Sequence, residues 1–232
     1  MKGKGEIEVW EAVRDSFGII LHNPIILLPM LAVSLFGLFA NSVRETFMLY
    51  PIPSFPSIIK LLGFNSLFLF LSLLIYVFME GMYPLMVKNV LETKEIEIGA
   101  AFGCAVRKSL SLIVAGIFVF LLIGIGIIFF IIPGVVFAIW YFYTIPVIML
   151  EDRGVLEGMS ASKAFARDKM FDTFLLFLIP AVIVFLMGVF SLPLRLFVPA
   201  AEEIVNFILS LVVSTWMSVI PAYVYIKYKG EG

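Results

Sequence analysis

The segment from Ser109 to Leu150 contains no charged residue. About 20 apolar residues in a helix cross the roughly 30 Å hydrocarbon core of a bilayer, so this segment is long enough to cross twice. Pro133 and Gly134 lie near its middle and predict a tight turn between two antiparallel helices. A chain of 232 residues that is 62% hydrophobic and 14% charged also lacks the polar residues that would cover a soluble domain. The sequence therefore predicts an integral membrane protein.

Apolar stretches of spanning length recur along the rest of the chain. Hydropathy read against helix length predicts an all-α protein with six transmembrane helices in one domain, residues 1–232. The expected ranges are 24–43, 63–83, 110–131, 134–150, 172–192 and 204–226. A proline-rich outer loop, residues 44–62, is expected between the first two spans. The N-terminal residues include acids where a signal peptide would have its apolar core, so we expect no cleaved leader.

Basic residues are distributed unevenly between the two sides of the membrane that these spans define. Of the 16 Lys and Arg residues, all but Arg44, Lys60 and Arg195 fall in the termini or in residues 84–109 and 151–171. Because Lys and Arg favour the cytoplasmic side, we expect a multi-pass protein of the cell membrane with both termini in the cytoplasm.

Three short segments with helical periodicity precede the first, third and fifth spans. Their apolar faces are Val9, Val13, Phe17 and Ile20; Ile98, Phe102, Ala105 and Val106; and Val155, Met159, Ser162, Ala166 and Met170. Charged residues occupy the opposite faces, which predicts three amphipathic helices at the cytoplasmic interface.

The second, fourth and sixth spans each have a proline near the cytoplasmic end: Pro84, Pro146 and Pro221. Together with the interfacial helices, this pattern favours a threefold internal repeat of an interfacial helix followed by a helical hairpin. The repeat units would be residues 5–84, 96–150 and 154–227. The alternative is that any multi-span protein alternates such features.

A distinctive order of motifs follows the turn in the uncharged segment. The letters "IIPG" precede an aromatic-rich span, then "IPVIMLEDRG" and a small-residue helix, "LEGMSASKAF". This order resembles a broad group of prokaryotic and archaeal polytopic membrane proteins, and it is similar to the membrane domain fused to some glycerophosphoryl diester phosphodiesterases. The stretch "HNPIILLP", residues 22–29, is similar to that group's entry into the first span. The resemblance implies a membrane fold and location but no activity, because no phosphodiesterase domain is recognised in this sequence.

Polar side chains within apolar helices are costly, so they mark either a working surface or a contact between helices. On the second span Ser72, Tyr76 and Glu80 recur every four residues and share a face. The other candidates for an intramembrane polar site are Tyr141 and Thr144 on the fourth span, and Asn206, Ser210 and Ser214 on the sixth. We expect the return spans to line the bundle interior. Two interpretations of Glu80 remain open: it binds a cation or relays a proton, or it hydrogen-bonds a neighbouring tyrosine at headgroup level.

Charged residues at the cytoplasmic ends suggest other roles. Glu151 and Asp152 are interpreted as the border between a span and the next helix. Basic residues on the interfacial helices are candidate contacts for anionic lipid headgroups: Arg14, Arg107, Lys108, Lys163, Arg167 and Lys169.

Motifs for catalysis or cofactor binding are weak. Ser160 and Lys163 match Ser-x-x-Lys without its partner motifs. The single His22 and single Cys104 predict neither a metal site nor a disulfide. A net charge of −1 argues against a nucleic-acid partner. We therefore expect no enzymatic activity, no cofactor and no metal; the scarcity of Gln, Cys and His is typical of a thermophile.

Two functions follow as hypotheses. The first is a non-enzymatic membrane module that organises lipid or a partner protein at the cytoplasmic face. The alternative is a small transporter or channel with a polar interior around Glu80.

Overall fold

The computed structural model describes residues 7–48 and 55–231, and these residues form helices and turns without any strand. Within them, six helical stretches are long and apolar enough to cross a membrane, which confirms the predicted all-α class and the number of candidate spans. Their bounds are Pro24–Arg44, Asn65–Thr93, Ser109–Phe129, Ile131–Glu151, Met170–Pro193 and Ala201–Tyr228.

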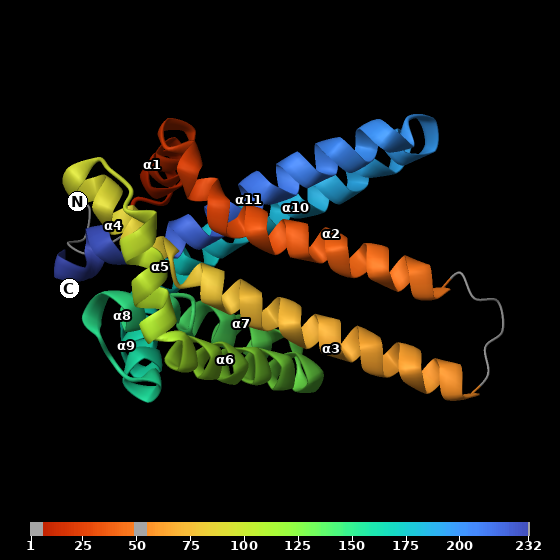
Figure 1. The fold of residues 1–232 in the computed structure, drawn as a ribbon. Helices are drawn as coiled ribbons and strands as arrows, with labels where there is room; N and C mark the ends of the chain where they lie inside the picture. Colours follow the sequence, from red (N-terminus) through yellow and green to blue (C-terminus); the bar gives the residue numbers. More distant parts are fainter. Residues whose placement is uncertain (1–6, 49–54, 232) are drawn as a thin grey trace.

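The spanning stretches form three hairpins. The α-helices in chain order are α1 (Val9–His22), α2 (Leu28–Met48), α3 (Phe55–Glu80), α4 (Tyr83–Thr93), α5 (Ile98–Arg107), α6 (Ser109–Phe129), α7 (Ile131–Trp140), α8 (Thr144–Glu151), α9 (Val155–Asp168), α10 (Met170–Phe197) and α11 (Pro199–Tyr228), with short 3₁₀ helices at Pro24–Leu27 and Lys229–Glu231. The hairpins α2–α3, α6–α7 and α10–α11 project from one end of the molecule and diverge (Figure 1).

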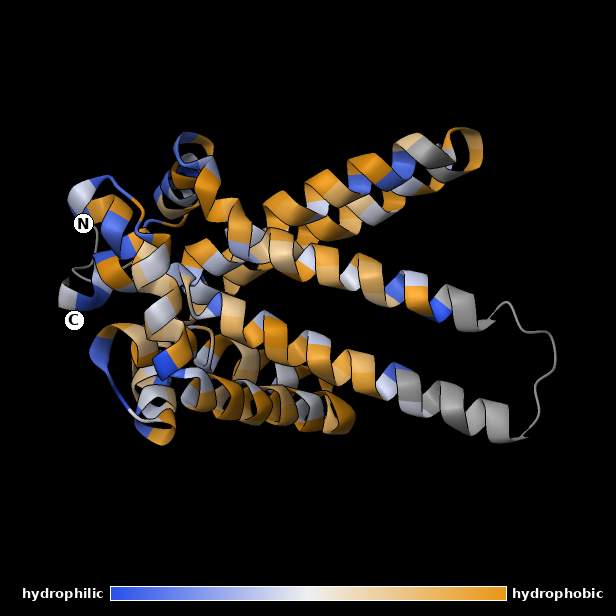
Figure 2. Ribbon diagram, viewed as in Figure 1, coloured by the Kyte–Doolittle hydropathy of each residue, from blue (hydrophilic) through white to orange (hydrophobic). Residues whose placement is uncertain are grey.

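The end from which the hairpins project is a packed layer of shorter helices. It consists of α1, α4, α5, α8, α9 and residues 213–228 of α11, and it contains most of the fully buried side chains. Helices α5 and α9 lie across the direction of the hairpins (Figure 1). We call it the terminal layer because both ends of the described chain meet there: the Glu8 backbone N–H donates to Tyr228 Oη at 3.3 Å. Hydrophilic residues gather in this layer, whereas the hairpins are mostly hydrophobic (Figure 2).

The helices α1, α5 and α9 contact the return helices in a cyclic order. Helix α5 packs on α3 and α4, α9 packs on α7 and α8, and α1 packs on α11. Each of the three helices has two small buried residues four positions apart at this contact: Ala12 and Ser16, Ala101 and Ala105, Gly158 and Ser162. Small residues at this spacing share one helix face and allow two helices to approach closely.

The apolar faces predicted for these helices contain both buried and exposed residues. In α5 the buried face is Ala101 and Ala105, while Phe102 and Val106 are 46% and 47% exposed. A larger side chain in the contact would hold the helices apart, so Phe102 and Val106 lie beside it; both are half-exposed, and the Phe102 ring also meets Phe78 of α3 edge-on.

Two return spans are interrupted where the sequence predicts one continuous helix. Helix α3 ends at Glu80 and α4 begins at Tyr83; helix α7 ends at Trp140 and α8 begins at Thr144. Each interruption lies within about one turn before a proline, Pro84 or Pro146, whose missing N–H and bulky ring disturb the preceding turn. Pro221 lies inside the uninterrupted α11, so a proline alone does not decide whether the helix breaks.

The turn between α6 and α7 differs from its predicted position. Phe130, with φ −160° and ψ 145°, is the one residue between the helices, and Pro133 lies in the first turn of α7, where a missing N–H costs little. Gly134 instead allows close packing: a Cβ on Gly126 would lie 2.7 Å from the Gly134 Cα. The prediction of a tight hairpin is confirmed, and the predicted turn residues are wrong.

The proline-rich loop is shorter than the predicted 44–62. Helix α2 continues to Met48 and α3 starts at Phe55. Pro56 occupies the second position of α3, where proline is compatible with a helix. Residues 49–54 lie outside the described part of the chain.

Candidate functional site

Glu80, at the last residue of α3, is joined to α11 by a hydrogen bond. Ser218 Oγ donates to Glu80 Oε2 at 2.7 Å, and Tyr76, one turn earlier on α3, also hydrogen-bonds the carboxylate. Ser218 is itself 2% exposed. The structure thus brings together two predicted site residues, Tyr76 and Glu80, with one residue of the polar face of α11.

Two further hydroxyl groups lie close to this acid. Tyr83 and Thr215 are 0% exposed and neighbour each other, and neither hydroxyl has a well-formed hydrogen bond to any described residue. Buried polar atoms without a partner are uncommon, and they are typical of places that hold water or an ion. The cluster of Glu80, Ser218, Tyr83 and Thr215 is therefore the best candidate for a polar site between the spans.

The other predicted polar residues do not converge on Glu80. Ser72 donates to Phe68 O at 2.7 Å, Ser210 donates to Phe207 O at 3.0 Å, and Asn206 hydrogen-bonds Glu202. Ser214 contributes its backbone carbonyl, which lies 3.1 Å from Ser218 Oγ and is an alternative acceptor for the single hydroxyl hydrogen of Ser218. These contacts within single helices satisfy the polar atoms locally.

Tyr141 and Thr144 lie on the interrupted fourth span, apart from this cluster. The Tyr141 ring stacks on Phe137, with centroids 6.4 Å apart. Thr144 is 2% exposed, and its hydroxyl has no hydrogen-bond partner among the described residues. The site that the sequence predicts across three spans is therefore smaller in the structure.

Hydrogen bonds between the terminal-layer helices and the return helices were not predicted. Trp216 Nε1 donates to Ser16 Oγ at 2.9 Å, joining α11 to α1. Ser162 Oγ donates to Trp140 O at 2.8 Å and accepts from the Tyr143 backbone N–H at 3.2 Å, joining α9 to the interrupted span. The signal in the sequence was a serine at small-residue spacing on an amphipathic helix.

Glu151 and Asp152 form the border that the sequence predicts, and they also join helices. Glu151 ends α8 and hydrogen-bonds Tyr225; it also pairs with Lys229 and Arg153 at 2.6 Å each. Asp152 has a left-handed backbone, φ 55°, that terminates the helix. Its hydrogen bond with Lys108 at 2.7 Å and the charge of that ammonium lower the pKa of Asp152.

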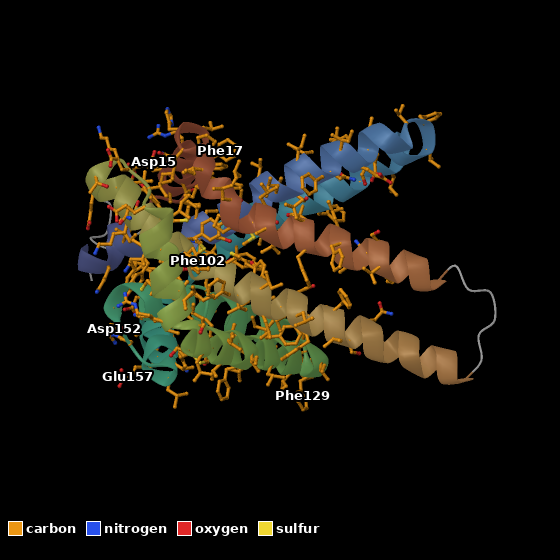
Figure 3. All side chains as sticks on the ribbon, viewed as in Figure 1. Asp15, Phe17, Phe102, Phe129, Asp152 and Glu157 are labelled. Atoms are coloured by element: carbon orange, nitrogen blue, oxygen red, sulfur yellow. The ribbon has the colours of Figure 1, made fainter. Side chains whose placement is uncertain are left out.

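A second charged cluster joins α1 to the end of α11 (Asp15 is labelled in Figure 3). Tyr223 Oη donates to Asp15 Oδ2 at 2.9 Å, and Lys227 Nζ lies 3.6 Å from the same oxygen. Partial burial raises the pKa of Asp15, but the hydrogen bonds from Tyr223 and Arg14 and the nearby positive charges outweigh it, so the pKa lies below 3.8.

The six basic residues predicted to contact headgroups fall into two groups. Lys108 donates to Ile148 O at 2.7 Å besides pairing with Asp152, and Lys169 is 7% exposed with its ammonium 4.7 Å from the Phe165 ring centre. These two lysines are held by the protein. Arg14, Arg107 and Arg167 are exposed on α1, α5 and α9, whereas Lys163 is half-exposed, with its ammonium 4.1 Å from the Trp140 ring centre.

The single histidine of the chain makes a structural hydrogen bond. His22 Nδ1 donates to Gly18 O at 2.7 Å at the end of α1, since a carbonyl can only accept. No group of three or more His, Cys, Asp or Glu side chains that could hold a metal ion occurs within residues 7–48 and 55–231.

Comparison of the chain with protein-family models, curated proteins and solved structures finds no match. The resemblance to the membrane domain of glycerophosphoryl diester phosphodiesterases therefore stays a prediction.

Proposed function

We propose that this protein is a non-enzymatic multi-pass module that binds and organises anionic lipid at the cytoplasmic face of the cell membrane. The observation that carries the proposal is the outer surface of α1, α5 and α9, where large exposed apolar side chains lie beside basic ones. Trp10 is 78% exposed on α1, Phe102 is 46% exposed on α5, and Leu156 is 73% exposed on α9.

This combination is unfavourable in water and favourable at a membrane surface. Apolar side chains of an interfacial helix bury among the acyl chains, while Lys and Arg beside them attract anionic headgroups. The exposed residues Arg14, Arg107 and Arg167 and the half-exposed Lys163 supply that charge. The terminal layer would then lie in the headgroup region, with the hairpins entering the bilayer and both termini in the cytoplasm.

The cyclic contacts of α1, α5 and α9 support the threefold repeat as part of this proposal. Each of these helices packs on the return helix of the unit before it, and α1 closes the ring on α11. Three interfacial helices in a ring would present lipid-binding surfaces around the whole terminal layer.

Reversal of charge tests the lipid-binding proposal. We expect the triple variant Arg107→Glu, Lys163→Glu and Arg167→Glu to lose affinity for anionic lipid, because each basic residue near the surface contributes about 1 kcal/mol. Together they would weaken binding at least about 100-fold. Native mass spectrometry of the detergent-purified protein titrated with an anionic phospholipid measures this loss.

The matched control is Lys88→Glu, which reverses a half-exposed basic residue on α4, outside the three helices. Lipid affinity close to that of the unmodified protein is expected for this control. Equal affinity of the triple variant and the unmodified protein would contradict the proposal.

A second function, binding of a proton or monovalent cation as in a small transporter, is favoured by one observation. Glu80 meets Ser218 across two spans, near the buried hydroxyls of Tyr83 and Thr215, which neighbour each other. On this hypothesis Glu80→Gln abolishes cation-dependent flux in proteoliposomes while leaving the fold intact. The matched control is Glu202→Gln, whose acid contacts Asn206 within one helix. Unchanged flux in Glu80→Gln would remove this second hypothesis.

A further inference from the structure

The tip of the α6–α7 hairpin is entirely apolar. Phe129, Phe130, Ile131 and Ile132 are 72%, 74%, 73% and 76% exposed, and no charged residue lies between Ser109 and Leu150. The far ends of the other hairpins differ, because α2 has the exposed Arg44 and α11 begins near the exposed Glu203. Four adjacent large side chains in water would be strongly unfavourable, at about 25 cal/mol for each Å² of apolar surface.

The contacts of Trp140 show how far this hairpin extends from the terminal layer. Ser162 of α9 donates to Trp140 O at 2.8 Å, and Lys163 Nζ lies 4.1 Å above the Trp140 ring centre. An ammonium group stays near the headgroups, so Trp140 belongs to the interfacial level. Helix α7 has 10 residues from Ile131 to Trp140. At 1.5 Å per residue it is about 15 Å long, only half of the roughly 30 Å hydrocarbon core.

Corresponding contacts in the other two units lie much further from their hairpin tips. On α11, Trp216 contacts Ser16, and about 26 Å of helix separates Trp216 from the start of the helix at Pro199. On α3, the Phe78 ring meets Phe102 edge-on, and about 35 Å of helix separates Phe78 from the start of the helix at Phe55. Both lengths approach or exceed the thickness of the hydrocarbon core.

The arrangement of the helices agrees with these lengths. The tip of α6–α7, where Phe129 is labelled, ends well short of the far ends of α3 and of α10–α11 (Figures 1 and 3). Although α6 has 21 residues, its first turns lie beside α8, since Lys108 donates to Ile148 O. Only the remainder of α6 accompanies α7, to which Gly126 and Gly134 hold it.

We infer that the α6–α7 hairpin is re-entrant: its tip lies among lipid acyl chains inside the bilayer, and only α2–α3 and α10–α11 cross to the opposite face. This inference rests on the proposed position of α9 at the membrane surface. A wholly apolar groove of about 490 Å³ runs beside α7 to Phe171 and Phe174 at the start of α10. Its lining and its position beside the tip fit an acyl chain as the occupant.

Spin labels on single cysteines test the depth of the tip. In a Cys104→Ala background, labels are placed at Phe130→Cys on the tip, at Glu203→Cys near the start of α11, and at Leu156→Cys on α9. In proteoliposomes, electron paramagnetic resonance measures collision of each label with oxygen, which is concentrated in the acyl chains, and with a water-soluble nickel complex. All three positions are exposed, so the substitutions leave the packed layer unchanged.

We expect the Phe130 label to collide with oxygen and be shielded from nickel, while the Glu203 label collides with nickel. Nickel access at Phe130 equal to that at Glu203 would overturn the inference, because the tip would then reach water. Shielding of Phe130 from both reagents would also overturn it, because the tip would then be covered by protein. The Leu156 label reports separately on the proposed function: strong nickel access with little oxygen access would place α9 outside the membrane surface.

Discussion

At the scale of residues, a few small or polar side chains join helices that are distant in the sequence. Ser16 and Ser162 are each small enough for a close helix contact and also hydrogen-bond the partner helix. The sequence suggested polar stripes, but not these pairings. Glu80 and Ser218 are 138 positions apart, and the spacing within either helix carries no information about the other.

The first prediction concerns Ser162. Ser162→Ala should lower the free energy of unfolding by about 1–3 kcal/mol, because the Tyr143 N–H and Trp140 carbonyl lose a buried partner. Thermal unfolding in mild detergent measures the change. Ser160→Ala, an exposed position on the same helix, is the matched control and should unfold at nearly the original temperature. An equal effect of the two substitutions would contradict the assigned role of Ser162.

The second prediction concerns pH and Asp15. Because the folded-state pKa of Asp15 lies below its ordinary 3.8, its ionised form stabilises the fold above that pH. This contribution is lost as pH falls through the lowered pKa. The unmodified protein should therefore exceed Asp15→Asn in melting temperature near neutral pH, and the difference should shrink below about pH 4. A difference that stays constant between pH 7 and pH 3 would show that the Asp15 charge has no such role.

At the scale of helices, long segments were predictable and interruptions were not. Hydropathy summed over about 20 residues is dominated by composition, so all six candidate spans could be predicted. The same proline signal precedes two different outcomes, a break before Pro146 and a continuous helix through Pro221. The proline positions alone therefore do not predict where a helix is interrupted. The candidate site could be predicted only in part, because Tyr83 and Thr215 belong to it through their burial, which the sequence does not show.

The return helices are more buried than the outward helices, as the sequence predicts. In their most apolar windows, 22% to 39% of the residues of the return spans are buried, against 11% to 17% for the outward spans. The return spans, which include Glu80, Tyr143 and Trp216, therefore make more of the contacts between helices, and α2, α6 and α10 make fewer.

The third prediction concerns the α6–α7 contact. Gly126→Ala should destabilise the protein, because the new Cβ would lie 2.7 Å from the backbone of Gly134 and force the helices apart. At Gly124 on the same helix, a Cβ would meet nothing within 4 Å. Gly124→Ala should therefore be neutral or stabilising, by up to about 1 kcal/mol from helix propensity. Equal melting temperatures for the two variants would exclude close packing at Gly126.

At the scale of the whole molecule, the terminal layer and the diverging hairpins serve different roles. Charge networks tie both ends of the chain into the layer, through Asp15 with Tyr223 and Glu151 with Tyr225. The hairpins instead expose apolar side chains along most of their length. This division suits a protein whose packed part lies at the membrane surface and whose hairpins are solvated by lipid.

The fourth prediction tests that position directly through Trp10, which is 78% exposed on α1. The chain has 3 tryptophans; Trp216 is only 4% exposed and is kept because it hydrogen-bonds Ser16 of α1, so Trp140→Phe leaves Trp10 as the one exposed indole emitter. Its fluorescence is measured in bilayers of lipids brominated at shallow or at deep acyl positions. We expect strong quenching by the shallow bromines and weak quenching by the deep ones, since an interfacial helix inserts only about 5–10 Å. Absence of quenching by either lipid would place α1 in water and contradict the proposed membrane-surface role of the terminal layer.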